Sequence, residues 1–164
     1  MDFPDLKSQS FKRITFLKPE MLSVGYNESY VLSSTNLTFQ NYSLDIFFSV
    51  ELFDEIDVET IQFSFDDEDI SALDAIHDNY IFKRSKSLHS FETSVKKPVP
   101  NSVGFSGYTQ VVHGKTYDNE EDASYFIATI EVENEYYVFQ MIGKRENMGY
   151  LYDDFIDILS SIEK

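Results

Sequence analysis

Hydrophobic residues recur along this chain with two different periods, and each period predicts a different kind of element. The clearest run, from Leu44 to Leu52, places an apolar side chain at every second position. Because successive side chains of a strand point to opposite faces, these apolar residues share one face, while Asp45, Ser49 and Glu51 fall on the other. The run therefore predicts a strand that turns one face to a hydrophobic core.

Further strands are predicted on both sides of this run. Val103–His113 is followed, after an acidic loop, by Tyr125–Glu133, and the link Glu133-Asn134-Glu135 leads into Tyr136–Ile142. This link predicts a tight hairpin, because asparagine tolerates the left-handed conformation that such turns need. Weaker strand patterns occupy residues 14–17, 30–39 and 85–95.

Two segments show the helical period instead. Apolar residues recur at three- and four-residue steps over about residues 66–83 and again over about residues 147–163. The first segment begins with acidic residues and ends at Lys83 and Arg84, an arrangement that suits the helix dipole. Asn147 is the expected N-cap of the second helix.

The order of these elements is strands, helix, strands, helix, with hairpin-length links rather than repeated crossovers. This order predicts an α+β fold, an α/β/α sandwich in which two main helices cover a central antiparallel sheet. A length of 164 residues suits one domain, 1–164, with a core of its own. We expect the polar residues 1–13 to form a loose lead-in.

Charge is the feature that most narrows the choice of partner. Asp and Glu number 29 against 13 Lys and Arg, which gives a formal net charge of −16. Such a surface repels phosphate backbones and anionic lipids, and it attracts a basic protein. Solubility alone is the simpler explanation of the charge. The residues expected to contact a basic partner form two acidic runs, Asp66, Asp67, Glu68 and Asp69, and Asp118, Glu120, Glu121 and Asp122.

The sequence lacks the motifs of common catalytic and metal-binding sites. The chain has no cysteine, and its histidines, His77, His89 and His113, lack the spacing of a metal site. Ser106 lies within a strand pattern rather than at a strand-to-helix elbow, and Gly104 and Gly107 beside it predict a bulge or a close packing point. We therefore expect no catalytic residues and no cofactor.

Calcium binding is the metal chemistry that the acidic loop comes nearest to. Asp118, Glu120 and Asp122 alternate, so an extended loop would place their carboxylates on one side. The loop lacks both the glycine and the final bidentate Glu of a calcium-binding loop.

His77 lies at the edge of a helix face, where we expect a partly buried ring with a local hydrogen bond.

The sequence as given also carries an expectation about compartment. Its first residues lack the basic start and apolar core of a secretory signal, and the longest apolar runs have the length of strands. We expect a cytoplasmic protein without membrane insertion. A removed signal or lipid anchor would instead place the protein outside the cytoplasm.

Three features of residues 40–164 occur together: Gly104-Phe105-Ser106-Gly107, the aromatic pairs Tyr125-Phe126 and Tyr136-Tyr137 of a hairpin, and a closing helix that ends near Ser161-Ile162. In these features the chain resembles the PsbP-like superfamily. The resemblance implies an α/β/α sandwich that works as an accessory or binding protein. It implies no catalytic residues, because this superfamily has no shared active site.

Three classes of function follow from these observations. The favoured one is a non-catalytic interaction module that binds, and in an immunity-like role neutralises, a basic protein. One alternative is a carrier of a small ligand or cation, which would use a concave sheet face lined by Tyr and Phe. The other is an enzyme, which would need a pocket in which a carboxylate meets a histidine.

Overall fold

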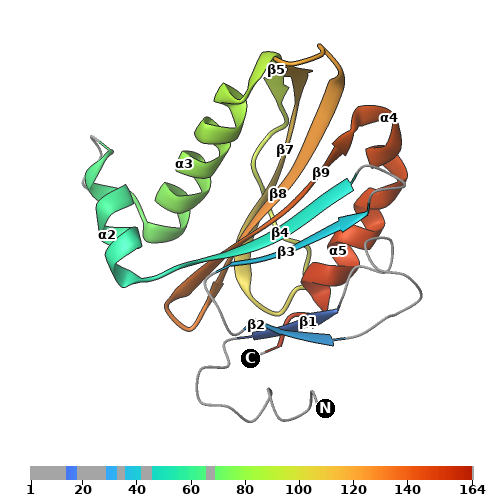
Figure 1. Cartoon of the computed structure of the whole chain (residues 1–164). Coiled ribbons are helices and arrows are strands. Elements are labelled where there is room, and N and C mark those ends of the chain that lie inside the picture. The colour runs from blue at the N-terminus through green and yellow to red at the C-terminus, as the bar shows by residue number, and fades with distance from the viewer. Residues whose placement is uncertain (1–13, 18–28, 33–35, 42–45, 66–68, 164) are drawn as a thin grey trace.

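The computed structural model describes residues 14–17, 29–32, 36–41, 46–65 and 69–163 (Figure 1). The predicted lead-in, residues 1–13, lies outside this part of the chain, as do Asp66, Asp67 and Glu68.

A seven-stranded antiparallel sheet forms the centre of the described structure (Figure 1). Its strand order is β3-β4-β9-β8-β7-β5, and β6 pairs with β7 beside β5. A separate antiparallel pair, β1 with β2, lies below it in Figure 1. The bounds are β1 Ile14–Leu17, β2 Ser29–Leu32, β3 Asn36–Asn41, β4 Ile46–Phe53, β5 Leu88–Thr93, β6 Lys97–Pro98, β7 Ser106–Thr116, β8 Asp122–Val132 and β9 Glu135–Lys144.

Helices cover both faces of the sheet, so the predicted α/β/α sandwich is confirmed (Figure 1). On one face lie α2, Glu55–Phe63, and α3, Ala72–Lys86. On the other face lie α4, Arg145–Met148, the 3-10 turn η2, Gly149–Leu151, and α5, Tyr152–Ser160. The two faces have separate hydrophobic clusters, because each strand sends alternate side chains to opposite sides.

The larger cluster lies under α5. There the alternating residues of β4 from Ile46 to Leu52 pack against Phe155, Ile158 and Leu159 of α5, as the pattern predicted. Phe16 of β1 joins this cluster, with its ring edge-to-face on Phe139 at a centroid distance of 5.5 Å. The cluster under α2 and α3 is smaller and includes Val58, Ile76 and Tyr80 from the helices.

Two details of the hairpin strands agree with the sequence. The turn between β8 and β9 has positive φ at both central residues, 47° at Glu133 and 68° at Asn134, as the predicted hairpin required. Gly107 is a close packing point, because an added Cβ would collide with the backbone carbonyl oxygen of Thr129. Gly104, in contrast, faces open space.

Several predicted boundaries were wrong. The strand expected over residues 30–39 is two strands, β2 and β3. The helix expected from residue 66 begins at Ala72, because Ser71 is its N-cap and its side chain accepts a hydrogen bond from the Asp74 amide. The last helix begins at Arg145, so Asn147 lies inside α4 and is no N-cap. A 3-10 turn starting at Gly149, a poor helix former, then interrupts it.

Candidate interaction surface

The basic residues of this chain are concentrated in a few segments, and the fold turns that pattern into a polarised surface. Residues 46–164 hold 24 acidic and 9 basic side chains, and no Lys or Arg occurs over residues 46–82 or 116–143. Phe53 at the end of β4 pairs with Tyr136 at the start of β9, so α2 and the β8–β9 turn lie at the same end of the sheet (Figure 1). We call this end the acidic end; its carboxylates are Glu51, Asp54, Glu55, Asp57, Glu59, Asp69, Glu131, Glu133 and Glu135.

The opposite end of the sheet carries mixed charge. Lys115 lies 3.3 Å from Asp122, and Arg145 lies 3.3 Å from Glu92. A groove of about 430 Å³ there is lined by residues of both signs: Glu121, Asp122, Lys144, Arg145 and Glu146. The acidic loop between β7 and β8 therefore has cations beside it.

The structure separates the two acidic runs that the sequence singled out. Asp69 precedes the start of α3, whereas Asp118, Glu120, Glu121 and Asp122 lie in and next to the β7–β8 loop, near where β5 begins after α3. All five are exposed. Helix α3, whose 15 residues span about 22 Å, lies between the two runs, so the runs are at opposite ends of this helix.

Among the described residues, no group of three or more His, Asp or Glu side chains could hold a metal ion.

Helix α2, which the sequence did not predict, gives the acidic end an apolar face. Ile56 is 73% exposed and Phe63 is 90% exposed. These residues are seven positions apart and Thr60 stands between them, so all three lie on one side of the helix. We call Ile56, Thr60 and Phe63 the α2 stripe. The opposite side of α2 is anchored in the core by Val58.

The start of α2 is held by a reciprocal capping box. The Oδ1 of Asp54 accepts a hydrogen bond from the Asp57 amide at 2.9 Å, and the Oδ2 of Asp57 accepts one from the Asp54 amide at 3.2 Å. These bonds satisfy two amide donors at the helix start. Because Val58 also packs into the core on the opposite side of the helix, α2 holds the α2 stripe in a fixed position.

A second apolar surface lies between α3 and β5. Phe82 is 58% exposed and Phe91 is 51% exposed, and both line an open groove of about 350 Å³. Cations border this groove, since Lys96 lines it and the Nζ of Lys86 lies 4.3 Å from the Phe82 ring centroid.

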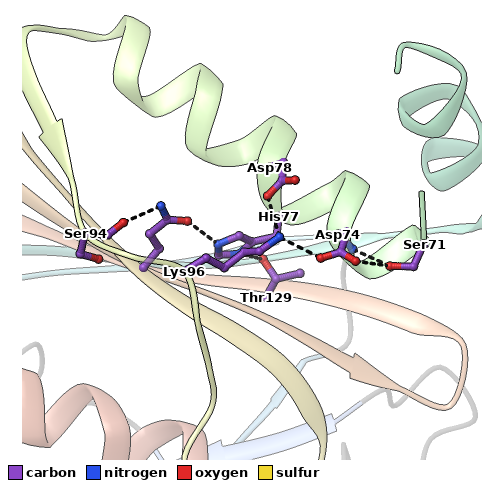
Figure 2. Close-up of polar contacts among 8 residues, drawn as sticks. Ser71, Asp74, His77, Asp78, Ser94, Lys96 and Thr129 are labelled. Atoms are coloured by element: carbon purple, nitrogen blue, oxygen red, sulfur yellow. Dashed lines mark hydrogen bonds and ion pairs between the residues drawn. The ribbon is translucent and has the colours of Figure 1, made fainter. Parts of the chain in front are cut away.

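Beside this groove, a polar cluster ties α3 to the chain that follows β5 (Figure 2). The Nζ of Lys96 donates to Oδ1 of Asp74 at 2.8 Å and to Oδ1 of Asp78 at 3.1 Å. The hydrogen bond from Lys96 is the main reason that the pKa of Asp74 lies below its usual value. Burial opposes the charge of Lys96, but its bonds to Asp74 and Asp78 outweigh burial and raise its pKa.

His77 is on the same helix as Asp74 and Asp78 and is fully buried, with Nδ1 2.8 Å from Oγ1 of Thr129 (Figure 2). Its Nε2 lies 3.0 Å from Oε1 of Gln110. The expected partly buried ring with a local hydrogen bond was wrong, because both partners lie on the sheet, 52 and 33 residues away. Burial lowers the pKa of His77. With both ring nitrogens bonded inside the protein, His77 fastens α3 to the sheet.

The other histidines lie at different places in the fold. The Nδ1 of His113 on β7 lies 2.6 Å from Oγ of the buried Ser124. The Nε2 of His89 on β5 lies 3.6 Å from Oε1 of Glu120, whose side chain is 75% exposed. The carboxylate–histidine pair of Glu120 and His89 thus lies at the surface rather than in a pocket.

The aromatic sheet face that a small-ligand carrier would need is filled by packed side chains. On the face toward α2 and α3, Tyr136 and Val138 belong to the smaller cluster, and on the other face Tyr137 and Phe139 belong to the larger one. Within the described residues, no helix is long and apolar enough to span a membrane.

Comparison by sequence finds no match, either to a family model or to a curated protein. Comparison by structure finds several. PA94 of Pseudomonas aeruginosa, a protein of unknown function, superposes with a TM-score of 0.55 at 9% identity, over 84% of this chain and 91% of that one. The Ran-binding protein Mog1p of Saccharomyces cerevisiae gives 0.47 at 10% identity, over 82% and 80%.

A PsbP protein is also among the similar structures. The PsbP protein of the cyanobacterium Synechocystis superposes with a TM-score of 0.50 at 12% identity, over 82% of this chain and 85% of that one. At such low identity the likeness concerns the fold. This chain therefore has the PsbP-like α/β/α fold that its sequence pattern resembled.

Proposed function

We propose that this protein is a non-catalytic binding module that recognises a basic protein partner through its acidic end. The observation that carries this proposal is the segregation of charge. The acidic end is built from two stretches of sequence without Lys or Arg, which the pairing of β4 with β9 brings together.

Electrostatics explains why segregation points to binding rather than to solubility. Clustered like charges repel one another and destabilise the compact state, so a role in solubility alone would favour dispersed charges. A one-signed surface steers an oppositely charged partner and raises the rate of encounter. Of the predicted contact residues that the structure describes, which are all exposed, Asp69 belongs to the acidic end, and we expect Asp118, Glu120, Glu121 and Asp122 to add only weakly to binding. We favour the acidic end because the β7–β8 loop has cations beside it.

The state of the polar groups supports a role without catalysis. His77 has both ring nitrogens bonded, and His113 bonds a buried serine. The grooves in the described structure are open, and the sheet faces are packed against helices. Neutralisation of a basic toxin-like protein in the cytoplasm is the specific role that we propose within this class, because covering a basic active surface needs only a complementary acidic one.

The test is capture from the native cell extract at 50 mM and at 500 mM salt. We expect wild-type protein to retain proteins of basic composition at low salt and to release them at high salt. The variant Glu55→Gln/Glu59→Gln should retain less, whereas Asp118→Asn/Glu121→Gln, with the same change in charge, should retain nearly as much. Retention without a basic bias, or retention that salt does not change, would contradict the proposal.

A further inference from the structure

The α2 stripe presents apolar area where a soluble protein would ordinarily place polar groups. Among the large hydrophobic residues of the described structure, Phe63 is the most exposed, and Ile56 is 73% exposed. A nine-residue helix needs only one buried face, which Val58 and Ile61 supply here. The two outward residues therefore add nothing to this packing.

The stripe and the acidic rim belong to the same few turns of helix. Glu55 precedes Ile56, and Glu59 lies one turn after it beside Thr60. Both carboxylates are exposed and lie along one side of the stripe, and the exposed Asp57 lies on the other side. The stripe thus offers an apolar centre with an anionic border, which is the usual order of a protein interface, apolar inside and polar at the rim.

We propose that the α2 stripe is the docking site for a basic amphipathic helix of the protein partner. Ile56 and Phe63 are two turns apart, about 10 Å along the helix axis, so they match two apolar side chains spaced seven residues apart on a facing helix. Lys or Arg side chains beside those anchors would meet Glu55 and Glu59. The proposal rests on the proposed function and adds the place of contact and the kind of segment bound.

Charge selects this occupant over the other candidates. A second copy of this chain would bring its own acidic end against the first, which like-charge repulsion opposes. An anionic lipid surface is disfavoured for the same reason. The groove of Phe82 and Phe91 also exposes two apolar side chains but borders Lys86 and Lys96, so its rim does not carry charge of a single sign and it serves as the control surface.

The probe is an 18-residue amphipathic helix made of lysine and leucine, compared with deca-lysine, which carries charge without apolar anchors. Fluorescence anisotropy with the full chain measures both affinities. Ile56→Gln/Phe63→Gln should weaken the lysine–leucine peptide about tenfold or more and leave deca-lysine nearly unchanged, because buried anchors carry most of the binding energy. The control pair Phe82→Gln/Phe91→Thr should change neither affinity. Thermal unfolding confirms that both variants fold, as exposed positions allow.

The outcomes separate this inference from the proposed function. If neither peptide binds the wild-type protein, the proposed function fails and the docking site with it. If the lysine–leucine peptide binds but the α2 variant binds it equally well, or if both double variants weaken it alike, the docking site is wrong and the acidic-end proposal stands. Shifts of backbone amide signals confined to α2 on peptide addition would support the site. Shifts centred on β5 would overturn it, as would self-association through α2 in sedimentation.

Discussion

The Nε2 of His77 lies 3.0 Å from Oε1 of Gln110, and this contact fixes the tautomer of a buried imidazole. The Nε2 of Gln110 donates to the carbonyl oxygen of Ser94 at 2.8 Å, so its Oε1 must be the atom that faces His77. The histidine Nε2 therefore carries the proton and donates. Its Nδ1 accepts from the hydroxyl of Thr129 at 2.8 Å, so the neutral ring satisfies both partners.

His77 predicts a loss of stability on mild acidification. Burial lowers its pKa from the ordinary value of 6.5, an effect that outweighs the hydrogen bond that the ring donates to Gln110 and the nearby Asp78 and Asp74, while Lys96 lowers the pKa further. As the pH falls, His77 is protonated in the unfolded chain before it is protonated in the folded protein. The stability that the neutral ring contributes is therefore fully present above about pH 6.5 and is lost as the pH drops toward the folded-state pKa. This residue changes the free energy of unfolding by at most about 1.4 kcal/mol per pH unit. Urea unfolding from pH 8 to pH 5 measures it.

The control for this prediction must separate His77 from His113, whose pKa burial also lowers. His77→Gln should flatten the pH dependence, while His113→Gln should leave the His77 part in place. Imidazole nitrogen shifts of the wild-type protein give the pKa of His77 directly. A value at or above 6.5 would refute the account of this buried ring.

We predict that Lys96 contributes modestly to the stability of the folded protein. Its side chain is 30% exposed and bridges Asp74 and Asp78, which lie four residues apart on α3. Lys96→Met removes both bonds and leaves two like charges on neighbouring turns. After allowance for solvent screening, we expect a loss of about 1 kcal/mol in the free energy of unfolding.

A double-mutant cycle with Asp74→Asn measures this coupling, and 1 M salt should reduce it. A coupling of zero at low salt would show that the bridge adds nothing.

Gly107 predicts a large effect of one methyl group. An added Cβ there would overlap the Thr129 carbonyl oxygen and crowd Cδ1 of Ile130, so neighbouring strands would have to separate. Gly107→Ala should cost about 2 kcal/mol or more. Gly104→Ala, three residues earlier in open space, is the matched control and should stay near wild type. Equal denaturation midpoints for the two variants would contradict the packing described.

Elements with one clear hydrophobic period were predictable from the sequence. The alternation in β4 and the three- and four-residue steps of α5 each reflect a face buried in the larger cluster. The bounds of α3 were shifted, because the acidic run before it suggested a first turn that Ser71 in fact delays.

Helix α2 escaped prediction for a physical reason that bears on function. Its apolar residues 56, 58, 61 and 63 do not share a face, since Val58 and Ile61 point to the core while Ile56 and Phe63 point to solvent. No single-face pattern could therefore reveal it. The acidic end was hidden for a similar reason, because only the pairing of β4 with β9 brings its two stretches together.

The most direct test of the binding account compares two variants of equal net charge. Deca-lysine affinity at 50 mM salt is measured by fluorescence anisotropy for wild type, Glu55→Gln/Glu59→Gln and Asp118→Asn/Glu121→Gln. The account predicts that the α2 variant weakens binding about fivefold, consistent with two rim charges, while the loop variant changes it little. Equal losses in the two variants, or a larger loss in the loop variant, would contradict the assignment of binding to the acidic end.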